Sequence, residues 1–105
     1  MSRVKLPVRR ASDTLKFSHG PRSYYATIGF YDAAQERPGE VFLSTGRTGT
    51  ELQALMRESA IAASLALQHG CSPEVLARAL SRDEQGEAET ALGRLFRIMT
   101  GEGEQ

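Results

Sequence analysis

The sequence predicts an α+β domain in which a three- to four-stranded antiparallel sheet is followed by two or three helices packed on one face. Three observations predict this class: alternating apolar residues fill the first half of the chain, helical periodicity fills the second half, and glycine-containing polar segments separate the two. Strands first and helices after are typical of an α+β sandwich. A chain of 105 residues suits a single domain, expected over residues 1–101, with a flexible tail at 102–105.

The first half of the chain predicts the strands. Residues 3–10 alternate apolar and basic side chains, which indicates a half-buried strand or an extended arm, and Pro7 restricts a strand here to a sheet edge. Residues 15–19 and 23–31 are expected to pair as a hairpin around Gly20 and Pro21. On the second of these strands one face carries Tyr24, Ala26, Ile28 and Phe30.

A short strand at 40–44 and a long helix follow. Consecutive apolar residues in the strand predict burial on both of its faces. The helix is expected to begin near residue 49, and two Ser/Thr-x-x-Glu/Gln spacings can cap it: Thr48 with Glu51, and Thr50 with Gln53. From 60 to 67 almost every residue is Ala, Ile or Leu, so the helix is predicted to be a central core helix buried on all sides.

Two further helices complete the predicted domain. Gly70 is expected to end the long helix, and Ser72 with Pro73 to start a second one over 72–81. A third helix is predicted over 87–99, with an apolar stripe made of Ala88, Ala91, Leu92, Leu95, Phe96 and Met99. This stripe either closes the core or forms a homodimer interface.

Charge is distributed unevenly along the sequence although the net charge is zero. Residues 1–25 carry a net charge of +5 and residues 83–105 a net charge of −4. A second basic feature, Arg47 and Thr48, lies between two glycines where the long helix begins, and a helix N-terminus attracts anions. Arg9, Arg10, Arg47 and Thr48 are therefore the candidate residues for binding an anion or a partner.

The titratable residues predict no catalytic site. His19 is expected at the hairpin end, and His69 in the last turn of the long helix, where it suits the helix dipole. The single cysteine, Cys71, permits no internal disulfide and no cysteine-based metal site. No metal or cofactor is expected. The chain has no signal peptide and no apolar run long enough to span a membrane, so a cytoplasmic location and no membrane contact are expected.

Residues 67–82 suggest an alternative function, a small DNA-binding regulator with a helix-turn-helix. Its recognition helix would begin at Ser72, but Glu74 near the start would repel phosphate, and the basic residues Arg78 and Arg82 come late. The zero net charge also makes nucleic acid an unfavourable partner.

Several segments in succession resemble the TSCPD domain, which occurs at the C-terminal end of adenosylcobalamin-dependent (class II) ribonucleotide reductases and in small free-standing proteins. The similar segments lie between residues 6 and 80: 6–7, 9–12, 17–24, 39–43, 64–70, 73–76 and 79–80. The chain departs from the family after Ser81, and it lacks the Thr-Ser-Cys-Pro-Asp string that names the family.

The resemblance implies a role in deoxyribonucleotide synthesis, as a non-catalytic accessory or docking module for the reductase catalytic chain, with nucleotide phosphate as a further ligand. It does not imply reductase activity in this chain. Reduction by that chemistry needs a thiyl cysteine, a cysteine pair and a large cobalamin-binding barrel, and this chain has one cysteine.

Overall fold

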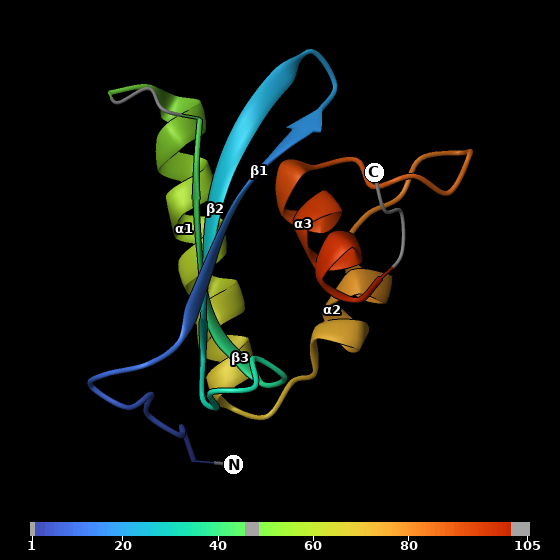
Figure 1. Cartoon of the computed structure of the whole chain (residues 1–105). Coiled ribbons are helices and arrows are strands. Elements are labelled where there is room, and N and C mark those ends of the chain that lie inside the picture. Colours follow the sequence, from blue (N-terminus) through green and yellow to red (C-terminus); the bar gives the residue numbers. More distant parts are fainter. Residues whose placement is uncertain (1, 46–48, 102–105) are drawn as a thin grey trace.

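Three strands form an antiparallel sheet in the order β1-β2-β3, and three helices follow, in the computed structural model (Figure 1). The structure describes residues 2–45 and 49–101. The elements are Ser12–His19 (β1), Arg22–Phe30 (β2), Pro38–Ser44 (β3), Glu51–Gln68 (α1), Pro73–Ala79 (α2) and Ala91–Met99 (α3). The predicted α+β class is confirmed, with three strands in the described part of the chain.

Residues 3–10 form an extended arm and do not join the sheet. The half-buried strand, one of the two alternatives, is wrong because Val4 and Val8 are both exposed. The arm is held instead by individual hydrogen bonds to the rest of the domain. The Val4 amide donates to the carbonyl of Gln68 at 2.8 Å, and the Tyr31 hydroxyl donates to the carbonyl of Val4.

The hairpin between β1 and β2 has the predicted position and faces. Its strands pair from Ser12↔Gly29 to His19↔Arg22, leaving a two-residue loop. Gly20, the first loop residue, has a φ of +60°, which glycine adopts without strain and which type II′ turns require. The predicted inner residues of β2, Tyr24, Ala26, Ile28 and Phe30, are all buried.

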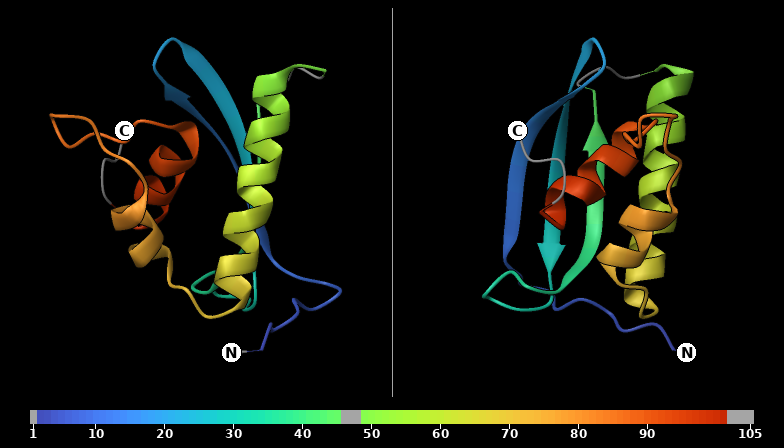
Figure 2. Two further views of the ribbon diagram at one scale, coloured as in Figure 1. Left: turned by 180° about the vertical axis from the view of Figure 1, so that it is seen from behind. Right: turned by 90° about the vertical axis from the view of Figure 1, so that its right-hand side faces the viewer.

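Helix α3 closes the core over the inner face of the sheet (Figure 2). Leu95 and Phe96 are completely inaccessible to solvent, so this part of the apolar stripe packs inside the molecule. These two residues are therefore not available on the surface for a dimer interface. The helix begins at Ala91, later than the predicted residue 87, because the Thr90 hydroxyl caps it by accepting from the Gly93 amide at 3.1 Å.

Helix α1 lies along the outer edge of β3, whereas α3 crosses the inner face of the sheet (Figure 2). The prediction of a helix buried on all sides is therefore wrong: Ile61 is 54% exposed and Leu65 is 39% exposed. At an edge, only part of the helix circumference meets the core. The prediction that β3 is buried on both faces is wrong for a related reason, since no element of the described residues covers its outer face and Phe42 is 57% exposed.

The ends of α1 follow the local sequence signals. The Thr50 hydroxyl accepts from the Gln53 amide at 3.0 Å, so the second of the two predicted capping pairs is present. Gly70 has a φ of +101° and ends the helix. Ser72 then caps α2 by accepting from the Val75 amide at 3.2 Å.

The arrangement of α1 and α2 does not support the helix-turn-helix alternative. Helix α2 packs against α3 and makes hardly any contact with α1. In a helix-turn-helix the two helices support each other, so that the second is held in the major groove. The resemblance of 67–82 to this motif is local, and the tertiary packing contradicts it.

Candidate functional site

Polar side chains of α1 cover the backbone edge of β3. The Ser64 hydroxyl accepts from the Val41 amide at 2.9 Å and donates to the Val41 carbonyl at 3.2 Å, and both residues are buried. The Gln68 side-chain amide donates to the Gly39 carbonyl at 2.8 Å. At the other end of β3, the Gln53 side-chain oxygen accepts from the Thr45 amide at 3.2 Å. The helix therefore satisfies an edge that would otherwise attract another strand.

The arm packs against the start of β3 through a glycine. A Cβ added at Gly39 would lie 2.6 Å from the Tyr31 ring and 2.7 Å from the Leu6 side chain, so only glycine allows this approach. The guanidinium of Arg37 also lies over the Tyr31 ring, 5.0 Å from its centre. The hydrogen bond from Val4 to the Gln68 carbonyl places the arm next to the C-terminal end of α1.

Arg10, one of the predicted binding residues, forms an ion pair with Glu40. The distances are 2.7 Å from Nε to Oε2 and 3.3 Å from Nη2 to Oε1, and the guanidinium also donates to the Pro7 carbonyl. Glu40 lies over Gly29 of the neighbouring strand, where an added Cβ would be 2.2 Å from its Oε2 atom. In this conformation Arg10 connects the arm to the outer face of the sheet.

The other predicted binding residues are not brought together with Arg10 by any described contact. Arg9 is exposed in the arm. Arg47 and Thr48 lie outside the described residues. Anion binding at these four positions stays a prediction.

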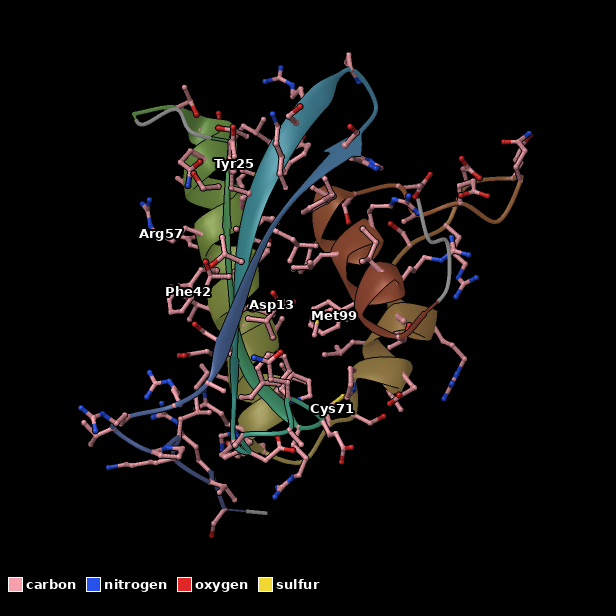
Figure 3. The ribbon with its side chains drawn as sticks, viewed as in Figure 1. Asp13, Tyr25, Phe42, Arg57, Cys71 and Met99 are labelled. Atoms are coloured by element: carbon pink, nitrogen blue, oxygen red, sulfur yellow. The ribbon has the colours of Figure 1, made fainter. Side chains whose placement is uncertain are left out.

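A groove follows the seam between α1 and β3, and we call it the seam groove. It has a volume of about 370 Å³. Phe42, Ile61 and Leu65 give it an apolar surface, while Arg57 and Arg3 also line it. Phe42 and Arg57 lie on the side of the molecule away from α3, as does Tyr25 (Figure 3). This side combines exposed apolar and basic side chains.

A second concavity of about 450 Å³, the inner pocket, lies between α1, the hairpin end and the segment that enters α3. Its walls are mainly apolar, including Leu52, Leu55 and Met56 of α1. Two polar groups at the pocket already have protein partners: His19 Nε2–H donates to the Glu89 carbonyl at 3.1 Å, and the Thr90 hydroxyl caps α3. The mainly apolar walls suit the inner pocket to apolar contact.

The remaining candidate chemical groups have structural roles. His69 is the C-cap of α1, which agrees with its predicted place at the C-terminal end of the long helix, and its Nδ1–H donates to the Leu65 carbonyl at 2.8 Å. Cys71 is half-buried, and its thiol donates to the Ser72 carbonyl at 3.7 Å. Among residues 2–45 and 49–101, no group of three or more His, Cys, Asp or Glu side chains is arranged to hold a metal ion.

Asp32 has a shifted pKa at the other end of the sheet, in the loop between β2 and β3. The backbone amide of Arg37 donates to its carboxylate at 2.9 Å, and that of Glu36 does so at 3.1 Å. The hydrogen bond from Arg37 is the largest cause of a lowered pKa for Asp32. This carboxylate orders the loop through these backbone hydrogen bonds, and the charge of Arg37 also lowers its pKa.

These features define a small α+β domain with an edge helix, a docked arm and two apolar concavities. Within the described residues, no helix is long and apolar enough to cross a membrane. The sequence profile of the TSCPD domain matches residues 2–100. The chain belongs to the TSCPD domain family.

Curated relatives of this chain are B12-dependent ribonucleotide reductases, which it matches over a small region. The reductase of Rhodopirellula baltica is 34% identical over 79 residues, which are 75% of this chain and 7% of the relative. Those of Bradyrhizobium diazoefficiens and Agrobacterium fabrum are each 38% identical over 68 residues, 65% of this chain and 5% of the relative. No solved structure gives a significant match.

Several residues in the segments that resemble the TSCPD domain make the contacts between α1, the edge of β3 and the arm. Ser64, Gln68, Gly39 and Glu40 belong to the similar segments, and sequence analysis did not assign them a role. One signal was present, because Ser64 and Gln68 are polar residues that interrupt an apolar helical run. A second was Gly29 in the middle of a strand, which indicates close approach by a neighbour.

Proposed function

We propose that this chain is a non-catalytic accessory module that docks on a B12-dependent ribonucleotide reductase and serves deoxyribonucleotide synthesis. The observation that carries the proposal is the match of three quarters of the chain to a small region of such a reductase. The two apolar concavities support docking, because exposed apolar surface bordered by charge is typical of interaction sites. The single cysteine also supports a non-catalytic role, since a dithiol reductant needs two.

Binding to a purified reductase tests this function directly. We expect the immobilised chain to bind the Bradyrhizobium diazoefficiens reductase saturably in biolayer interferometry. A parallel assay with adenosylcobalamin, a dithiol and ribonucleotides checks the non-catalytic part, and we expect no deoxyribonucleotide from this chain alone. Deoxyribonucleotide formation by the chain, or no association with the reductase, would contradict the proposal.

A more specific part of the proposal is that the chain binds nucleotides through the basic N-terminal region or through the segment before α1. Arg9 is exposed in the arm, beside the C-terminal end of α1, whereas Arg47 and Thr48 precede the N-terminus of α1 in the sequence, so they are two separate candidate positions for a phosphate. A nucleotide at one hundred times its dissociation constant stabilises a protein by about 2.7 kcal/mol. We expect such a thermal shift with ribonucleotides or deoxyribonucleotides, and its loss in Arg9→Ala and Arg47→Ala.

A further inference from the structure

Helix α1 has more apolar surface than this domain covers. A helix that is apolar on all sides is ordinarily buried, yet Ile61 and Leu65 remain exposed on its outer flank. Phe42 of β3 is exposed next to them and lines the same groove. Three exposed large apolar side chains from two elements therefore line one groove.

The charges around the seam groove are basic at both of its ends. Arg57 belongs to the N-terminal half of α1, whereas Arg3, in the arm, donates to the side chain of Gln68 at the helix C-terminus. Eleven residues of helix separate positions 57 and 68, a distance of about 16 Å. Glu40 is the carboxylate in the lining, and Arg10 already pairs with it. The groove therefore has an apolar middle and two cationic ends.

The polar groups of the groove restrict what can occupy it. Ser64 and Gln68 are engaged with the backbone of β3, and Gln53 with Thr45 just after it, so a partner strand cannot pair with this edge of the sheet. The Ser64 hydroxyl both donates to and accepts from Val41, and the Gln53 side-chain oxygen accepts from both the amide and the hydroxyl of Thr45. An occupant must bind through apolar side chains and its own charges.

We propose that the seam groove binds an amphipathic helical segment of a partner protein, with apolar side chains on Phe42, Ile61 and Leu65 and carboxylates near both ends. About three helical turns span the distance between the two arginines. A helix in a groove needs only side-chain contacts, and acidic ends complement the cationic ends of the groove. This inference rests on the proposed docking function and names the surface that performs it.

Two synthetic peptides of equal length provide the probe. Both carry leucines at helical spacing, one with glutamates near both ends and the other with lysines there. Titration of the ¹⁵N-labelled protein is expected to shift the amide signals of Phe42, Ile61 and Leu65, with about tenfold tighter binding of the glutamate peptide. Equal affinity for the two peptides, or shifts confined to other residues, would overturn the proposal.

Matched variants make the assignment specific. Ile61→Asp is expected to weaken binding of the glutamate peptide at least about tenfold, because a carboxylate would enter the apolar middle. Arg57→Glu is expected to abolish most of the preference for glutamate over lysine. Val75→Asp is the control, because Val75 is a similarly exposed aliphatic residue on α2, outside the groove. Equal weakening by the control would count against the groove.

Four other results would each have a definite meaning. If ADP or dATP shifts the signals of the same amides and the peptides do not, the occupant of the groove is a nucleotide and the proposal of a helical segment is wrong. Concentration-dependent shifts without any ligand would identify a second copy of the chain as the occupant.

If the reductase binds wild type and Arg57→Glu equally, the assignment of docking to the seam groove is wrong but the docking function stands. If the glutamate peptide binds and the reductase does not, the groove stands and the proposed partner is wrong.

Discussion

Asp32 orders the loop between β2 and β3 by accepting backbone hydrogen bonds from Arg37 and Glu36. These amide donors favour the ionised carboxylate, which is why its pKa is lowered in the folded protein. A group with a lowered folded-state pKa stabilises the protein at pH values above its unfolded-state pKa, and the stabilisation is lost as the pH falls through the folded-state pKa.

The Asp32→Asn variant tests this linkage. We expect wild type to be more stable than the variant near neutral pH, by a constant amount above about pH 5. The difference should shrink steadily as the pH falls below about 4, because the wild-type carboxylate becomes protonated. Urea unfolding of both proteins from neutral to acid pH measures the difference. A difference that does not change with pH would contradict the assignment.

Gly29 is constrained by one neighbour, Glu40, whose side chain occupies the space of a Cβ atom. We expect Gly29→Ala to displace Glu40 and weaken its ion pair with Arg10, costing about 1 kcal/mol or more of unfolding free energy. The same substitution in a Glu40→Ala background should cost much less, because the conflict is removed. A double-mutant cycle from urea unfolding gives the coupling. Equal costs in the two backgrounds would mean that Glu40 is not the constraint.

Among the elements, α1 combines two roles that usually belong to different structures. It is a core helix on the flank that carries Met56, Ala60 and Ala63, and it is the covering element of a sheet edge on the flank that carries Ser64 and Gln68. Covering the edge prevents association with another strand. The third flank, with Ile61 and Leu65, is left for the proposed partner.

The Ser64→Ala variant measures the value of the covered edge. It leaves the buried amide of Val41 without its described partner, so we expect a loss of about 1–3 kcal/mol in unfolding free energy. Ser59→Ala is the matched control, because Ser59 is exposed on the same helix and gains the same helix propensity. Similar effects of the two substitutions on urea unfolding would show that the contact with β3 is unimportant.

For the whole molecule, stability depends on α3 closing the core over the sheet. Phe96 is completely buried, and its replacement by Ala should cost about 3–5 kcal/mol of unfolding free energy. Val75→Ala, at an exposed position on α2, should change little. Thermal unfolding at several protein concentrations measures both. A midpoint that rises with concentration, with a small effect of Phe96→Ala, would instead support the predicted homodimer through residues 87–99.

Much of the local structure could be predicted from the sequence, because short-range chemistry decides it. Alternation of apolar residues predicted the buried face of β2, and Thr50, Gly70 and Ser72 predicted the ends of α1 and the start of α2. The resemblance to the TSCPD domain was also visible before the fold, and the sequence profile over residues 2–100 confirms it. The binding residues Arg9, Arg10, Arg47 and Thr48 remain a prediction.

The fold class, the order of the elements and the family could all be predicted from the sequence. Three further features depend on contacts in the folded chain: α1 lies at the edge of β3, the arm stays outside the sheet, and Phe42, Ile61 and Leu65 face solvent. The physical reason is that periodicity reports which side chains avoid water but not which neighbour covers them. An apolar helix can satisfy the same pattern inside its own domain or against a partner, and that choice depends on contacts between residues distant in the chain.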